Sequence, residues 1–180
     1  FTANIYYESS DGLQWQRPNL GQREFRGSRD NNLLGYDFSD FGGPFRVGGA
    51  HVFRLPQPHQ DKGRFGMLLQ GQPLKPIPEN DHGMNHFLAF SDDGYTWRLR
   101  KENNPFFRGR SDSPQQRILW NPQREVFMYY RRATICAKEV RRVAYAESPD
   151  LINWTQPRLI VGTDELDVNY LYGMGVMRYQ

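Results

Sequence analysis

Short apolar runs, each closed by a polar turn, follow one another along most of the chain. Runs that are rich in aromatic and β-branched residues, and that end in Ser, Asp or Gly, are typical of β-strands that enter hairpins. No apolar stripe with a helical period continues long enough to predict a helix. The expected strands are 4–7, 33–36, 50–55, 65–70, 86–90, 117–120, 126–131, 140–146 and 155–161.

Three of the turns share the pattern Ser-x-Asp-[Gly/Leu]-x-x-Trp, at residues 9–15, 91–97 and 148–154, and are called here the first, second and third turns. Asp and Ser side chains can bond to the backbone of such a turn, and glycine supplies a position with positive φ. The Trp would begin the return strand and cover the turn. Hairpins recur in any β-protein, but three copies with one Trp offset predict a structural repeat.

The repeat extends beyond the hairpin. Trp15 and Asp30 are 15 residues apart, as are Trp97 and Asp112, and an apolar segment follows each Asp. A repeated unit of several short strands is typical of a β-propeller blade. We therefore expect an all-β propeller segment. Its parts would be the end of one blade, two complete blades and the start of another, at residues 1–24, 25–100, 101–161 and 162–180.

The number of blades in the chain is smaller than a propeller needs. Propellers close with 4–8 blades, and this chain offers about two complete ones. We therefore expect the chain to be a piece of a longer protein, or its propeller to be completed by self-association. Otherwise the open blade edges would be exposed.

Composition agrees with a globular β-protein and excludes several classes. Hydrophobic residues make up 38% of the chain and charged residues 24%, so a core can form. The 23 basic and 20 acidic side chains are interspersed, and without a Lys/Arg stripe we expect no nucleic-acid partner. The single Cys136 excludes an internal disulfide framework. No apolar stretch approaches the ~18 residues of a membrane span, so no membrane association is expected.

Further motifs resemble those of the five-bladed propeller glycosidases. They are Gly-Ser-Arg-Asp-Asn-Asn at 27–32, Phe-Met-Tyr-Tyr-Arg at 127–131 after an Asn-Pro turn, and Arg-x-x-Tyr-x-x-Ser-x-Asp at 142–150. The resemblance covers almost the whole chain. It is to glycoside hydrolase families 32 and 43, and especially to uncharacterised bacterial relatives of family 32. It implies five blades whose innermost strands begin at a central pocket, where carboxylates from three blades act on the sugar.

The resemblance also implies catalytic residues. Family 32 uses an Asp nucleophile, a transition-state-stabilising Asp in Arg-Asp-Pro, and an acid/base Glu in Glu-Cys. Asp112 and Glu165, which are 53 residues apart, best match the last two. The match is partial, because the chain has Arg-Ser-Asp-Ser-Pro at 110–114, Asp-Glu-Leu-Asp at 164–167, and no Asn-Asp-Pro-Asn-Gly motif. Either the nucleophile lies outside this chain, or the protein does not hydrolyse by that scheme.

A physical argument adds Asp30 to the catalytic candidates. A furanoside hydrolase passes through an oxocarbenium-like state, and it needs one protonated and one ionised carboxylate on opposite faces of the sugar. The repeat-equivalent acids Asp30 and Asp112 could converge on the propeller axis with a third acid, which is Glu165 or Asp167. Crowding of like charges would then raise one carboxyl pKa. The alternative is that Asp30 and Asp112 only cap turns before strands.

Substrate-binding candidates come from strand ends. The guanidinium of Arg131 could hold a carboxylate or sugar hydroxyls, and the alternative is a structural ion pair. Tyr170 and Tyr172 could stack on a sugar ring, although aromatic residues at strand spacing are more often core. Asn31 and Asp167 are the other two substrate-binding candidates.

Two classes of function remain. The first is a glycoside hydrolase that acts on a fructosyl- or arabinosyl-type furanoside, and the second is a non-catalytic sugar-binding or assembly propeller. In both the expected partner is a carbohydrate. We expect no cofactor and no metal, because His82 and His86 in a Gly-Asn loop are a weak ligand pattern. An extracellular or periplasmic location is expected, although the sequence shows no signal peptide.

Overall fold

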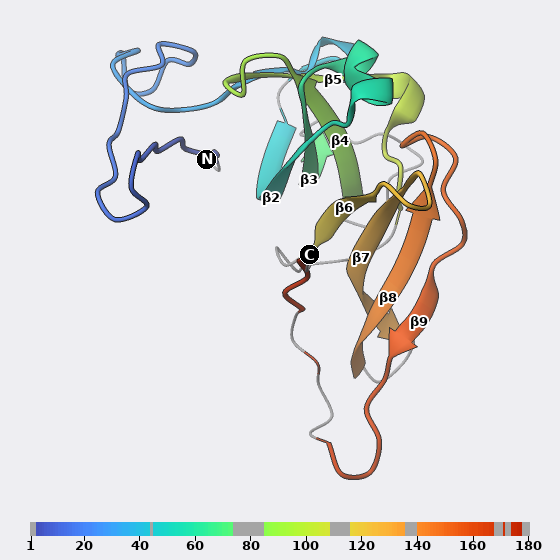
Figure 1. Cartoon of the computed structure of the whole chain (residues 1–180). Helices are drawn as coiled ribbons and strands as arrows, with labels where there is room; N and C mark the ends of the chain where they lie inside the picture. The colour runs from blue at the N-terminus through green and yellow to red at the C-terminus, as the bar shows by residue number, and fades with distance from the viewer. Residues whose placement is uncertain are drawn as a thin grey trace.

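The computed structural model describes residues 3–43, 45–73, 85–108, 116–135, 140–167, 171 and 174–177. Over these residues the chain is all-β, as expected, with two sheets. The two sheets form the body of the molecule. The N-terminal segment, residues 3–34, precedes the first strand, and part of it extends away from the sheets (Figure 1). Three short 3-10 helices connect strands, namely η1 (Ser39–Phe41), η2 (Gln57–Lys62) and η3 (Lys101–Asn103). Within the described ranges, no helix has the length and apolarity to span a bilayer.

The first sheet has five strands in the order β1-β5-β4-β3-β2. Neighbouring strands are antiparallel except β1 and β5, which run parallel. Its strands are β1 (Gly35–Asp37), β2 (Phe45–Arg54), β3 (Phe65–Pro73), β4 (Asn85–Ser91) and β5 (Thr96–Leu99). Thus β2 to β5 form a meander, and β1 is added at its far edge.

The second sheet has four antiparallel strands in the order β6-β7-β8-β9. They are β6 (Arg117–Asn121), β7 (Val126–Ile135), β8 (Val140–Ser148) and β9 (Arg158–Val161). This meander is the counterpart of β2 to β5, because the second and third turns join the last two strands of each.

The position of β1 differs from the expectation. The sequence places the first strand of unit 25–100 directly after Asp30. In the structure the strand after Asp30 is β1, and it lies beside β5, where Gly35 N donates to Tyr95 O at 2.9 Å. The counterpart of β6 is therefore β2, at the opposite edge of the sheet. A short three-residue strand can pair at either edge, and only long-range packing decides which.

The hydrogen bonds of the repeated turn are confirmed in all three copies, but only Trp97 lies in the return strand, which is β5. In the second turn the Ser91 hydroxyl donates to Asp93 Oδ1 and accepts from Gly94 N, and Asp93 Oδ1 also accepts two further backbone N–H groups. The Trp97 indole N–H donates to Gly94 O. The first and third turns contain the same five bonds, and all fifteen distances lie between 2.7 and 3.2 Å.

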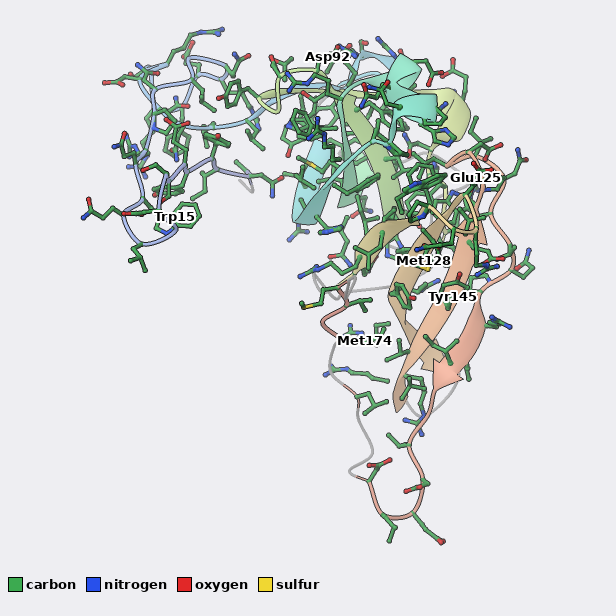
Figure 2. The ribbon with its side chains drawn as sticks, viewed as in Figure 1. Trp15, Asp92, Glu125, Met128, Tyr145 and Met174 are labelled. Atoms are coloured by element: carbon green, nitrogen blue, oxygen red, sulfur yellow. The ribbon has the colours of Figure 1, made fainter. Side chains whose placement is uncertain are left out.

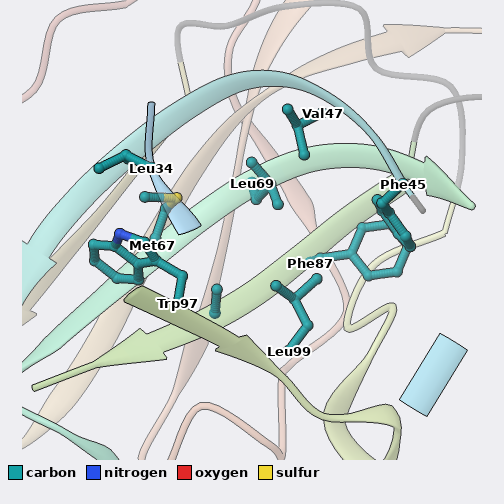
Figure 3. Close-up of a cluster of buried hydrophobic side chains, with 9 residues drawn as sticks. Leu34, Phe45, Val47, Met67, Leu69, Phe87, Trp97 and Leu99 are labelled. Atoms are coloured by element: carbon teal, nitrogen blue, oxygen red, sulfur yellow. The ribbon is translucent and has the colours of Figure 1, made fainter. Parts of the chain in front are cut away.

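Two cores lie on opposite faces of the first sheet. Alternate residues of a strand point to opposite faces, and all seven residues of β4 are buried. Phe87 and Ala89 belong to an outer core, in which Phe87 lies with Phe45 and Leu69 (Figure 3). Tyr6 and Leu20 of the N-terminal segment pack against this core. Leu88 and its neighbours form an inner core between the sheets. Its buried members are Leu55, Leu68, Leu88, Phe90, Ile118, Phe127, Tyr129, Ala146 and Leu151.

Candidate functional site

Buried polar side chains gather where β3 and β7 end and where β4 and β6 begin. Gln70 pairs with His86 in the β3–β4 register, and the amide of Gln116, directly before β6, lies 3.0 Å from His86 Nε2. We call this region the polar end. Its buried polar members are Gln70, Asn85, His86, Gln116, Arg131 and Arg132, all less than 9% exposed.

A closed hydrogen-bond ring joins the two sheets at the polar end. The Tyr129 hydroxyl donates to Gln116 Oε1 at 2.6 Å, and the Gln116 amide donates to His86 Nε2. The ring proton of His86 therefore lies on Nδ1, which contacts the Tyr129 oxygen. Burial lowers the pKa of His86 well below its usual value and raises the pKa of Tyr129. Both groups stay neutral, so the ring is a structural link between sheets.

Arg131 lies beside this ring and is itself buried. Its guanidinium carbon is 3.8 Å from the centroid of the Phe107 ring, and its Nε donates to Arg132 O at 3.1 Å. Desolvation lowers the pKa of Arg131. Among the described residues no carboxylate forms an ion pair with it. A positive charge held against an aromatic ring is suited to binding carboxylates or hydroxyls.

A small pocket opens beside Arg131. The backbone N–H of Leu171 donates to Arg141 O at 3.3 Å, which holds the C-terminal segment against the start of β8. The lining of this arginine pocket is Tyr130, Arg131, Arg132, Arg142, Val143, Leu171 and Met174. The pocket is small and its wall is mostly apolar, so the three arginines that line it present few N–H donors to it.

Three of the residues predicted to act on the sugar lie outside the described residues: Asp112, Tyr170 and Tyr172. His82 also does. Tyr170 and Tyr172 flank Leu171 in the sequence, and Leu171 lines the arginine pocket.

The structure gives Asn31 a role in its own turn. Its amide donates to the carbonyl oxygens of Arg23 at 2.8 Å and Ser28 at 3.2 Å, and its Oδ1 accepts from Leu33 N at 3.0 Å. Asp30 is exposed, and its backbone N–H donates to the Ser28 hydroxyl. Both residues belong to the N-terminal segment.

Glu165 and Asp167 lie in an exposed turn after β9. Asp167 Oδ2 accepts from Asp164 N at 3.2 Å, and Asp164 Oδ1 accepts from Leu166 N at 2.9 Å. Figure 1 shows this turn at the opposite end of the molecule from the N-terminal segment. The described residues therefore do not bring Asp30 together with Glu165 and Asp167.

The hydrogen-bond ring was not predicted from the sequence. There His86 stood only as a weak metal-ligand candidate, and Gln116 and Tyr129 had no role. One signal was available, because His86 is a polar residue at the start of an otherwise apolar strand, where a buried side chain needs a hydrogen-bond partner.

No protein-family model matches the sequence, and comparison with curated proteins finds no match. Two solved structures share the fold. One is described as "Glycoside hydrolase", with 20% identity and a TM-score of 0.57 over 74% of this chain and 39% of that chain. The other is described as a complex of BT0996 and RGII, with 22% identity and a TM-score of 0.55 over 73% of this chain and 38% of that chain. This chain thus matches about two fifths of the length of each.

Proposed function

We propose that this chain forms blades of a five-bladed β-propeller glycoside hydrolase that acts on a fructosyl- or arabinosyl-type furanoside. The repeated meander carries the proposal, because β2 to β5 and β6 to β9 are four-stranded meanders that share one turn motif and pack face to face, although β1 is added to the first. Stacked four-stranded antiparallel sheets are the units of propellers. The two solved structures that share the fold support a carbohydrate-related role, since one is described as a glycoside hydrolase and the other as an RGII complex.

The polar end supports the position of the substrate site. Asp112 precedes Gln116 by four residues in the sequence, and Tyr170 and Tyr172 flank Leu171. Gln116 belongs to the polar end, and Leu171 lines the arginine pocket. In the proposal Arg131 holds the sugar hydroxyls there, because a buried guanidinium loses little side-chain freedom on binding.

In the proposed chemistry two carboxylates act on the anomeric carbon. Glu165 serves as the general acid, and Asp112 stabilises the oxocarbenium-like transition state. Asp30 fits less well, because its segment lies far from the turn that carries Glu165. The expected location stays extracellular or periplasmic, where polymeric sugars are available.

The test uses nitrophenyl fructofuranosides and arabinofuranosides with the full-length protein that contains this chain. We expect hydrolysis of one class, a loss of about 10²-fold or more in kcat for Glu165→Gln and Asp112→Asn, and unchanged sugar binding. Glu102→Gln is the matched control, since Glu102 is exposed in η3. A protein that hydrolyses none of these substrates, or that tolerates Glu165→Gln, does not work in this way.

One observation favours a non-catalytic sugar-binding propeller as the second candidate. Arginines and apolar side chains line the pocket beside Arg131, and the lining contains no carboxylate among the described residues. Under this alternative the protein binds furanosides without turnover, and Arg131→Ala weakens binding while Glu165→Gln does not. Binding measured by calorimetry, together with the hydrolysis assay, separates the two functions.

A further inference from the structure

Two contacts hold the guanidinium of Arg131 in one orientation. Arg131 lies in β7, at the wall of the arginine pocket that Met174 borders from the C-terminal segment (Figure 2). Its guanidinium carbon is 3.8 Å from the centroid of the Phe107 ring, and its Nε donates to Arg132 O at 3.1 Å. Arginine side chains stack with their flat face on aromatic rings. Phe107 therefore fixes the plane of the group, and the Nε hydrogen bond fixes its direction.

Phe107 is itself tied to β4 of the first sheet. The His86 N–H donates to Phe107 O at 3.1 Å, and the ring centroids of these two residues are 5.7 Å apart. Further along β4, the Asn104 side chain accepts from Leu88 N at 2.6 Å and donates to Leu88 O at 2.8 Å. Segment 104–107 thus lies beside the first half of β4, while β5 pairs with the second half. The ring under Arg131 is therefore held by the neighbouring sheet.

The stack leaves one edge of the guanidinium to a ligand. Arginine has five N–H donors, and Arg132 O takes the one on Nε. Within the described ranges neither Nη group of Arg131 forms a hydrogen bond or an ion pair. Neither is among the buried atoms that lack a partner, so both lie at the surface. Two Nη groups in one plane can bond to two oxygen atoms that lie side by side.

We propose that Phe107 is a positioning residue, which makes Arg131 a two-pronged clamp for two neighbouring hydroxyl groups of the furanosyl ring. The Nη groups bond to the two sugar oxygens, and the Phe107 ring behind them keeps the guanidinium flat. A group that is held in its binding geometry beforehand loses less entropy when the ligand binds. This inference rests on the proposed function, because it assigns how Arg131 holds the sugar that is hydrolysed.

The test measures kcat and KM for nitrophenyl arabinofuranosides and fructofuranosides with the full-length protein that contains this chain. Phe107→Leu keeps an apolar side chain but removes the aromatic face, so it should raise KM by about ten-fold and change kcat by less than about two-fold. Phe107→Tyr keeps the face and should have a KM close to that of the parent. Phe106→Leu is the matched control, since Phe106 packs on Tyr129 and Trp154 of the inner core.

A second arm separates positioning from a general loss of structure. A structural defect would raise KM whether or not the Arg131 guanidinium is present. In an Arg131→Ala background, Phe107→Leu should cause no further rise in KM, because the ring then has no group to position. Urea unfolding shows whether each variant is folded. If Phe107→Leu does not fold, Phe107→Met takes its place, because methionine fills irregular space and also lacks an aromatic face.

Three results would overturn the inference while the parent still hydrolyses a furanoside. They are an unchanged KM in Phe107→Leu, an equal rise of KM in Phe106→Leu, and a further rise when Phe107→Leu is added to Arg131→Ala. In each case the proposed function stands and only the clamp is wrong. A parent that hydrolyses neither class of substrate contradicts the proposed function itself, and the clamp with it.

Discussion

Leu151 occupies a backbone conformation that its residue type disfavours. Its φ is +68°, and the equivalent residues of the other turns are Gly12 and Gly94, with φ of +75° and +83°. A side chain at positive φ costs on the order of 1 kcal/mol. Leu151 is only 1% exposed and belongs to the inner core, and burial of a Leu side chain contributes about 1.5–3 kcal/mol. Burial therefore offsets the strain.

At position 151 the Gly variant should be more stable than the Ala variant, which is the reverse of the usual order within a strand. Both Leu151→Ala and Leu151→Gly lose the buried side chain, at a cost of about 2–5 kcal/mol. Only glycine also relieves the positive φ, so we expect the Gly variant to be the more stable by about 1 kcal/mol. Urea unfolding of both variants measures the difference.

The control for this comparison is Leu88, which is buried in β4 and lies in the same core. There Leu88→Gly should be less stable than Leu88→Ala, since glycine is disfavoured within a strand. If Leu151 shows the same order as Leu88, the positive φ carries no strain that matters.

At the scale of strands, the sequence predicts what is local. The three turns follow from Ser, Asp and Trp within seven residues, and their bonds are as expected. The parallel pairing of β1 with β5 joins Gly35 to Thr96, and no local pattern encodes it. The candidate site likewise has a part that local sequence indicates and a part that only long-range contacts create. The sequence singled out Arg131 after an aromatic run, although β7 continues past it to Ile135. By contrast, His86 meets Gln116 and Tyr129 across 30 and 43 residues of sequence.

His51 links the two sheets at the β2–β6 contact. Its Nδ1 accepts from Ile118 N at 3.3 Å, and this bond requires an unprotonated Nδ1. Burial, with a smaller effect of the Arg117 charge, lowers the pKa of His51 to about 4. An unfolded His has a pKa of about 6.5, so the unfolded state takes up a proton first as the pH falls.

The stability of the protein should therefore decrease as the pH falls from about 6.5 towards 4. The contribution of neutral His51 is complete above pH 6.5 and is lost below it, because only the unfolded state is protonated in this window. In His51→Gln the amide oxygen can still accept from Ile118 N, but it does not titrate. Urea unfolding at pH 7 and pH 5 should show a smaller pH effect in the variant. An equal pH effect in both proteins would mean that His51 does not contribute.

At the scale of the molecule, the chain is a stack of layers in which the first sheet is the middle one. Tyr6 and Leu20 of the N-terminal segment pack on one of its faces, and the second sheet packs on the other. A strand that is buried on both faces reads as a continuous apolar run, which is what residues 87–90 show. The sequence thus indicates that β4 is central, but it does not reveal which segment lies on each side.

Two neighbouring residues of β4 test this layered order. Phe87 and Leu88 are both 0% exposed, but Phe87 faces the outer core and Leu88 faces the inner core. Each change to Ala should cost about 2–5 kcal/mol, so stability alone does not distinguish them. Hydrogen exchange does. Phe87→Ala should speed exchange most in the N-terminal segment, and Leu88→Ala should speed it most in β6 to β8, because a local opening follows the contacts that are lost. If both variants loosen the same segment, the two faces of β4 do not serve separate cores.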